Sequence, residues 1–145
     1  MTGAFLLGLF GTILSVISLT WQVFSWRASG ARRKVACVSS YPLGGGIPEI
    51  ELLGIQVANS GRSSTVINNV AFKLPDGTFL QILEDAASIV ILPYEIRPGE
   101  VITVHCVPLQ LKESMQKQGY PPDTSITPKV SSGHGDSTGK AIQLD

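Results

Sequence analysis

The first 26 residues contain no charged side chain, so all 11 basic and all 11 acidic residues of the 145-residue chain lie beyond them. The chain has only two cysteines and two histidines. Two cysteines exclude a disulfide-dense secreted miniprotein, and equal numbers of basic and acidic residues exclude a basic nucleic-acid-binding domain. With 43% hydrophobic residues the chain is not a disordered acidic tail, and its length excludes a multidomain enzyme.

The charges that are present divide the chain into three parts. Residues 27–48 carry four basic side chains and no acidic one, and residues 49–145 carry seven basic and eleven acidic side chains, a balance of −4. We therefore predict a transmembrane helix over residues 1–26, a basic juxtamembrane linker over residues 27–33 and a soluble domain over residues 34–145.

The apolar segment from Ala4 to Trp26 is long enough to cross a bilayer. Its 23 residues reach roughly 34 Å as a helix, against a hydrocarbon core of about 30 Å. Trp21 and Trp26 are placed for the headgroup level, where Arg27 leaves the membrane. A cleaved signal peptide is the alternative. Only three uncharged residues precede the apolar run, which ends in Trp-Arg, and this favours a retained anchor.

The flanking charges predict the orientation, because short flanks rich in lysine and arginine remain in the cytoplasm. No basic residue precedes the helix and four follow it, so we expect a single-pass protein of the cell membrane, with its N-terminus outside and its soluble domain in the cytoplasm. The four basic residues either bind anionic membrane lipid as well or determine topology alone; they are Arg27, Arg32, Arg33 and Lys34.

Small and polar residues recur along the apolar segment at alternating spacings of four and three, which places them on one helix face. This stripe consists of Ala4, Gly8, Gly11, Ser15, Ser18, Gln22 and Ser25. Membrane helices associate through close approach at small residues and through hydrogen bonds between polar ones. The stripe thus predicts a partner helix, from a second copy of the chain or from another membrane protein. Alternatively, it reflects only the abundance of Gly and Ser in membrane helices, since Thr12 and Thr20 lie off it.

The soluble part consists of short alternating runs separated by turn residues, which predicts antiparallel β-structure with a strand about every ten residues. The expected strands are Lys34–Ser40, Glu49–Ala58, Thr65–Leu74, Thr78–Leu83, Ser88–Leu92, Val101–Val107, Ser125–Val130 and Lys140–Leu144. One short helix is expected between Val107 and Pro121, where Leu111 and Met115 are four apart. Residues 131–139 are rich in Gly and Ser and are expected to form a mobile hairpin loop.

Two strands have readable faces. In the third strand Val66, Val70, Phe72 and Leu74 are in phase and are expected to share one face. In the second strand the apolar phase changes beside Gly54, which predicts a β-bulge there.

The turns resemble those of a known group of proteins. Asn59 with Gly61-Arg62, the Asp76-Gly77 hairpin and the turn Ile96–Glu100 follow an apolar helix that ends in Trp and a basic linker. This arrangement resembles the immunoglobulin-like β-sandwich of uncharacterised bacterial single-pass membrane proteins. The resemblance covers most of the chain and implies a fold but no activity. The longer last hairpin, with its histidine, departs from that pattern.

The sequence contains no convincing catalytic or metal-binding motif. The segment Gly133–Lys140 resembles a phosphate-binding loop, but the residue five before Gly139 is His134 and alanine follows the lysine. His105 and His134 are too few for a metal centre, and no histidine follows a serine in a catalytic arrangement. We therefore expect no enzyme, no cofactor and no metal.

Four further residues have candidate roles. Cys37 and Cys106 are expected to be reduced, buried and apolar in a cytoplasmic domain, or to form one disulfide if the domain faces outward. Arg62 and Arg97 lie in turns and either bind carboxylates of a partner or remain solvated.

These features together predict a membrane-anchored binding or scaffolding module that recruits a protein partner. Two alternatives remain open. One is a ligand-sensing regulatory subunit that signals through the helix stripe, and the other is an outward-facing envelope component.

Overall fold

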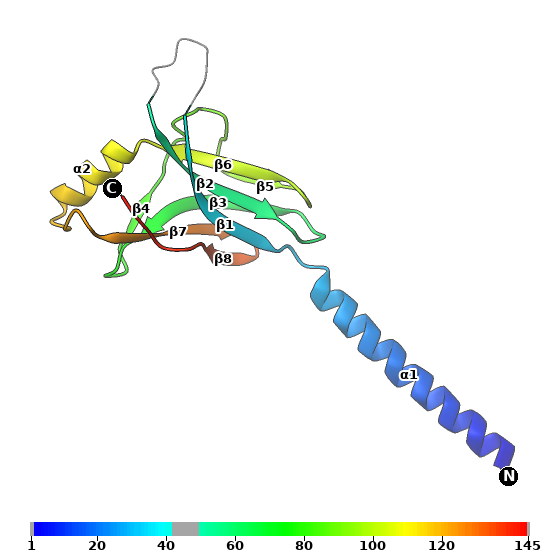
Figure 1. Cartoon of the computed structure of the whole chain (residues 1–145). Coiled ribbons are helices and arrows are strands. Elements are labelled where there is room, and N and C mark those ends of the chain that lie inside the picture. The colour runs from blue at the N-terminus through cyan, green and yellow to red at the C-terminus, as the bar shows by residue number, and fades with distance from the viewer. Residues whose placement is uncertain (1, 42–49, 145) are drawn as a thin grey trace. The chain divides into compact units, whose positions relative to one another are not determined.

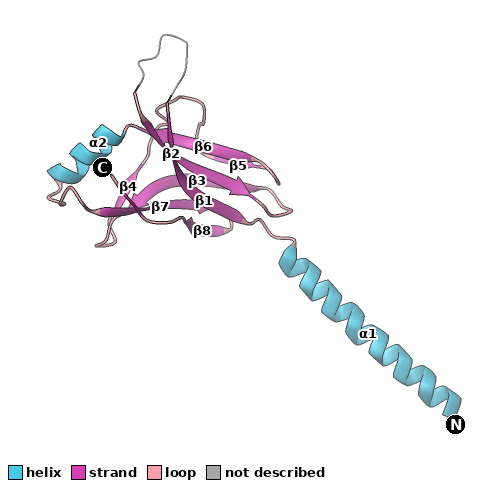
Figure 2. Ribbon diagram, in the orientation of Figure 1, coloured by secondary structure: helices cyan, strands magenta, loops and turns pink. Residues whose placement is uncertain are grey.

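The computed structural model describes residues 2–41 and 50–144 and divides the chain into two compact units, residues 1–30 and residues 31–145. Among the described residues, the first unit is a helix and the second contains the strands and one further helix (Figures 1 and 2). The mainly β, antiparallel class predicted from the sequence is confirmed, together with the N-terminal apolar helix and the short second helix.

Helix α1 spans Thr2–Ala28, two residues beyond the expected end at Trp26. Its most apolar window has a mean hydropathy of 2.0, so the helix is long and apolar enough to cross a membrane. It ends where both the backbone N–H and the hydroxyl of Ser29 donate to the carbonyl oxygen of Trp26. None of its residues is buried.

The second unit contains two antiparallel sheets. The first sheet has the order β1-β2-β6 and consists of β1 (Arg33–Ser40), β2 (Leu52–Asn59) and β6 (Val101–Cys106). The second has the order β4-β3-β7-β8 and consists of β3 (Thr65–Lys73), β4 (Phe79–Gln81), β7 (Ser125–Ser132) and β8 (Gly135–Thr138). Two short strands extend it, as β5 (Tyr94–Ile96) pairs with β3 and β9 (Ile142–Gln143) pairs with β7.

One hydrophobic core lies between the two sheets. The alternation along the strands directs every second side chain inward, and both sheets contribute. The buried core side chains include Leu53, Ile55, Val57, Ile102 and Val104 from the first sheet and Ile67, Val70, Phe72, Ile96, Ile126 and Val130 from the second. Helix α2 (Pro108–Lys117) begins with a proline and adds Leu111 and Met115 to the core, as their spacing predicts.

The prediction of a strand over Ser88–Leu92 is wrong. The structure has no strand there and places β5 at Tyr94–Ile96 instead. The reason is the side chain of Asp85, which accepts hydrogen bonds from the backbone N–H groups of Ala87, Ile89 and Val90. These donors are used locally and cannot join a β-ladder.

The predicted bulge lies in a different strand. β2 pairs in regular register through Gly54 with both neighbours, whereas β3 shifts register between Ile67 and Asn69. As a result Ile67 is fully buried and Val66 is 40% exposed, so Val66 does not share the inner face with Val70. The expected start of the second strand at Glu49 lies outside the described residues.

The C-terminal segment is also more regular than expected. β7 continues to Ser132 and, after Gly133 and His134, the chain returns as β8, where a mobile loop is predicted. The expected strand Lys140–Leu144 shortens to Ile142–Gln143.

Candidate functional site

The helix stripe lies on one face of α1, since the helix is continuous from Thr2 to Ala28. Within it the Ser15 hydroxyl donates to the carbonyl oxygen of Gly11 at 2.8 Å, and Nε2 of Gln22 donates to Oγ of Ser18 at 3.3 Å. Beside Gly8 and Gly11 the space that a side chain would fill is open. All seven stripe residues are exposed, and the role of the stripe in helix association stays a prediction.

The four basic residues after the apolar run do not share one environment. Arg27 lies in the last turn of α1, and Arg32 and Lys34 are exposed. Arg33 is half-buried: its guanidinium donates to the hydroxyls of Ser137 and Ser132 at 3.0 and 2.7 Å and to the carbonyl oxygen of His134 at 3.2 Å. Arg33 therefore links β1 to the β7–β8 hairpin, a role that the sequence did not reveal. Trp21 and Trp26 are 70% and 76% exposed.

The turns that carry Arg62 and Arg97 are brought together by Asn59, which is only 1% exposed. Nδ2 of Asn59 donates to the carbonyl oxygens of Ser63 at 2.8 Å and Ile96 at 3.3 Å. Its Oδ1 accepts from the backbone N–H of Gly61 at 3.0 Å. Both arginine side chains are exposed, so the arrangement leaves them available to a partner.

Asp85 and His105 form a buried polar pair that sequence reasoning missed. Oδ1 of Asp85 lies 3.0 Å from Nδ1 of His105 and accepts the His105 backbone N–H at 2.8 Å. Burial raises the pKa of Asp85, but the hydrogen bonds from Val90, His105, Ile89 and Ala87 outweigh it, and the net pKa lies below the usual value. Asp85 followed by small residues was the available sequence signal.

The two cysteines are free and half-buried. They lie on β1 and β6, with β2 between them, opposite Ile55 and Leu53 respectively. Neighbouring strands lie about 4.8 Å apart, so the two outer strands are about 9.6 Å apart. A disulfide needs Cα atoms within about 7 Å. The bridge expected for an outward-facing domain is therefore incompatible with this strand order.

Burial makes both thiols unreactive. It raises the pKa of the Cys37 thiol to about 11. Burial, together with the negative charge of a Cys37 thiolate, raises the pKa of the Cys106 thiol to about 12. At neutral pH both groups are therefore almost entirely in the protonated form, and only the thiolate is reactive.

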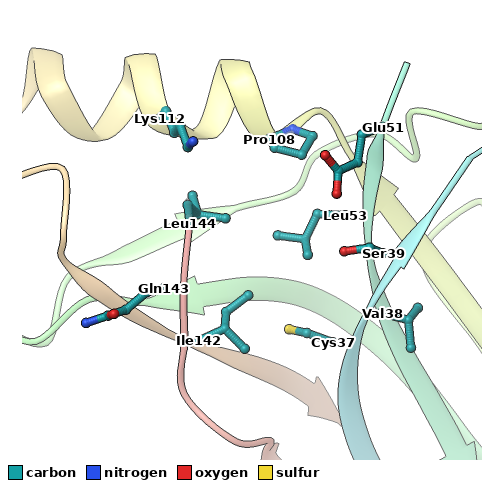
Figure 3. Close-up of a pocket in the computed structure, with 10 residues that line it drawn as sticks. All are labelled: Cys37, Val38, Ser39, Glu51, Leu53, Pro108, Lys112, Ile142, Gln143 and Leu144. Atoms are coloured by element: carbon teal, nitrogen blue, oxygen red, sulfur yellow. The ribbon is translucent and has the colours of Figure 1, made fainter. Parts of the chain in front are cut away.

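A cavity of about 260 Å³ opens between β1, α2 and the C-terminal segment (Figure 3). Leu53, Ile142 and Leu144 give it apolar walls, and Figure 3 shows Glu51 and Lys112 on the side of α2. Ligand pockets usually measure about 300–1,000 Å³ and hold several converging polar groups. This cavity is below that range, but a second one of about 360 Å³, lined by Leu83, Val90 and Leu92 beside Asp85, is within it, so cavity size does not argue against the ligand-sensing alternative.

The remaining candidate motifs have structural explanations. In the segment that resembles a phosphate-binding loop, residues Gly135–Thr138 form β8, and Nδ1 of His134 lies 2.8 Å from the Thr65 hydroxyl. Asp136 pairs with Lys129 at 2.9 Å. Among residues 2–41 and 50–144, no three histidine, cysteine or carboxylate side chains group as metal ligands would.

The fold and these sites define a mainly β protein with one apolar N-terminal helix. The sequence matches no protein-family model, and no curated protein matches it either. Among solved structures it is similar to a Bordetella pertussis protein provisionally named ApaA, with 11% identity and a TM-score of 0.38. That alignment covers 79% of this chain and 94% of the other, and at this level of similarity it carries no functional information.

Proposed function

We propose that this protein is a membrane-anchored, non-catalytic binding module that recruits or scaffolds a protein partner at the membrane. The observation that carries the proposal is the division of the chain into an apolar helix of 27 residues, none of them buried, and a separate unit with its own core. An exposed helix of this length and composition needs an apolar environment, and a bilayer supplies it.

The fold we propose for the module is an immunoglobulin-like sandwich. Strand order supports this assignment: β1-β2-β6 corresponds to strands A, B and E of such domains, and β4-β3-β7-β8 corresponds to C′, C, F and G. Helix α2 then occupies the connection between strands E and F. Domains of this architecture commonly bind partners through loops and sheet edges, with no chemistry of their own.

The orientation we propose has the N-terminus outside and the β-domain in the cytoplasm. Four basic residues follow the apolar run and support it under the positive-inside rule: Arg27, Arg32, Arg33 and Lys34. Cys37 and Cys106 are free and separated by β2, which suits a reducing compartment, where no disulfide is required.

Labelling of one introduced cysteine in intact cells tests anchoring and orientation together. Gln118 is exposed at the end of α2, and Thr2 is exposed at the start of α1. A membrane-impermeant maleimide should label Thr2→Cys in intact cells and should label Gln118→Cys only after lysis. The native thiols contribute little background because their pKa values are high.

Extraction at alkaline pH is the companion measurement, since it removes peripheral proteins from membranes but leaves spanning ones. The chain should remain in the membrane fraction. Release into the soluble fraction would refute the anchor, whereas labelling of Gln118→Cys in intact cells would refute only the cytoplasmic orientation.

A further inference from the structure

Three exposed arginines that are distant in sequence meet at one end of the β-domain. The hydrogen bonds of Asn59 described above join the turn that carries Arg62 to the turn that carries Arg97. Arg32 joins them, because its carbonyl oxygen accepts the backbone N–H of Ser60 at 2.7 Å. The Asn59 carbonyl oxygen accepts the backbone N–H of Gly99 at 2.8 Å, which adds a second link between Asn59 and the turn that carries Arg97. We call this surface the basic end.

The basic end carries few free carboxylates. Glu100 is held within the turn, where it accepts the Tyr94 hydroxyl at 2.6 Å and the Arg97 backbone N–H at 2.8 Å. Among the described residues of this end, the exposed acids are Glu95 and Asp136, and Asp136 is paired with Lys129 at 2.9 Å. Lys34 near the start of β1 adds a fourth exposed basic side chain. The surface is therefore basic, although the soluble part of the chain is mildly acidic as a whole.

The opposite end has mixed charge. Its turns and helix carry both signs, with the acids Glu51, Asp76, Glu113 and Asp123 and the lysines Lys73, Lys112 and Lys117. The two ends of the domain thus differ in electrostatic character, a property that pairing of the strands creates and that the linear sequence hides.

We propose that the basic end binds the anionic headgroups of the membrane in which α1 is anchored, with Arg32, Arg62 and Arg97 as the contacting residues. The inference rests on the proposed anchoring function. Chain continuity supports a lipid partner: the basic end is where the chain enters the domain, and only residues 29–32 separate α1 from β1 (Figure 1). At about 3.6 Å per residue at most, an extended linker of this length spans no more than roughly 15 Å.

Electrostatics favours the same partner. Each basic residue close to an anionic surface contributes about 1 kcal/mol, and the attraction falls off over the Debye length. Three arginines and Lys34 are sufficient to hold the tethered domain with this end on the bilayer. The cavity beside α2 and the turn that contains Asp76 lie at the other end of the strands and remain accessible to a cytoplasmic partner.

The test uses the full chain reconstituted into vesicles of phosphatidylcholine, with or without phosphatidylglycerol. A fluorophore on Pro98→Cys, an exposed position of the basic end, reports proximity through quenching by a headgroup nitroxide lipid. We expect about twofold stronger quenching in the vesicles that contain phosphatidylglycerol. Salt at 1 M should abolish the difference, because the Debye length is then about 3 Å. A fluorophore on Gln118→Cys should be insensitive to the lipid.

Two triple variants, each of which removes three positive charges, serve as test and control. Arg32→Gln/Arg62→Gln/Arg97→Gln should remove the phosphatidylglycerol dependence. Lys73→Gln/Lys117→Gln/Lys140→Gln removes the same charge from exposed positions elsewhere and should preserve it. Equal quenching in both lipids, with the chain still resistant to alkaline extraction, overturns this inference alone and leaves the basic end to an acidic protein partner. A chain that alkali extracts overturns the proposed function first.

Discussion

A single buried carboxylate, that of Asp85, shapes the segment between β4 and β5. It accepts hydrogen bonds from four backbone N–H groups and lies against His105 of β6, with its own side chain only 1% exposed. Because a carboxylate accepts several donors at once, it can replace the ladder bonds that this segment lacks. The rest of the segment is consequently an irregular loop, which the bonds between Asp85 and His105 connect to the first sheet.

Replacing this carboxylate tests its role. Asp85→Asn has nearly the same size, but its amide nitrogen cannot accept a hydrogen bond. We expect a loss of about 3 kcal/mol in the free energy of unfolding, measured by urea denaturation in detergent. The control Asp123→Asn removes an exposed carboxylate and should change stability by less than about 0.5 kcal/mol. Equal effects of the two substitutions would contradict the assignment.

The same carboxylate predicts a pH dependence. Its pKa in the folded protein lies below the unfolded value, so its stabilisation is complete above that unfolded value of about 4 and is lost as the pH falls through the folded one. The stability difference between wild type and Asp85→Asn should therefore shrink in acid. A difference that stays constant from neutral pH to pH 3 would show that the negative charge of Asp85 does not stabilise the fold.

The cysteines give a second prediction at the residue scale. With pKa values near 11 and 12, Cys37 and Cys106 should react with a thiol reagent at neutral pH at least about a hundredfold more slowly than in the denatured chain. The exposed Gln118→Cys serves as the fast-reacting control. Rapid labelling of the native thiols in the folded protein would show that β1 or β6 opens readily.

At the scale of elements, the closure of the β7–β8 hairpin against β1 depends on a glycine. A Cβ atom at Gly139 would lie 2.7 Å from the carbonyl oxygen of Val35 and 2.8 Å from Cγ of Pro128. The first of these atoms belongs to the backbone and cannot move aside without moving the strand. Gly139 thus permits the contact between β1 of one sheet and the end of β8 in the other.

Gly139→Ala should destabilise the β-domain by about 2 kcal/mol through this overlap. Gly133→Ala is the matched control, because its nearest neighbour, the Thr65 hydroxyl, is 4.0 Å away and the position has no positive φ. Thermal unfolding of both variants measures the difference. Similar melting temperatures would mean that the hairpin end shifts without cost.

Strand existence was easier to predict than strand ends. The alternation in β1, β3 and β6 and the Pro-Asp-Gly turn are local, so they are legible in the sequence. The wrong prediction of a strand over Ser88–Leu92 has a non-local cause. The continuous apolar run Ile89–Leu92 favours a strand, but Asp85 accepts hydrogen bonds from the backbone N–H groups of Ile89 and Val90. Asp85 in turn contacts His105 of β6, which is distant in the sequence.

At the scale of the whole molecule, the helix and the β-domain should behave independently. The core consists of residues from Leu53 onward, together with Val35 and Cys37 at its margin, and α1 contributes none. The triple substitution Gly8→Leu/Gly11→Leu/Ser15→Leu should weaken self-association or co-purification with a membrane partner by at least about fivefold, or about 1 kcal/mol. It should leave the urea midpoint of the β-domain unchanged.

Val16→Leu/Thr20→Leu is the control for the stripe, since both residues lie off the stripe. Crosslinking in membranes measures association, and urea denaturation in detergent measures stability. Unchanged association in the triple variant would show that the small residues of the stripe have no partner. A shifted urea midpoint would contradict the independence of the two units.

The sequence alone determined the features that depend on neighbours along the chain: the apolar helix, the basic linker, most strands, the short helix and the turns. Hydropathy and periodicity act over a few residues, so they are visible without a fold. The tertiary structure alone decided the features that depend on distant pairings. It separated Cys37 from Cys106 by β2, engaged Arg33 with the β7–β8 hairpin and joined Asp85 to His105. It also gathered Arg32, Arg62 and Arg97 at one end, because strand register sets long-range proximity.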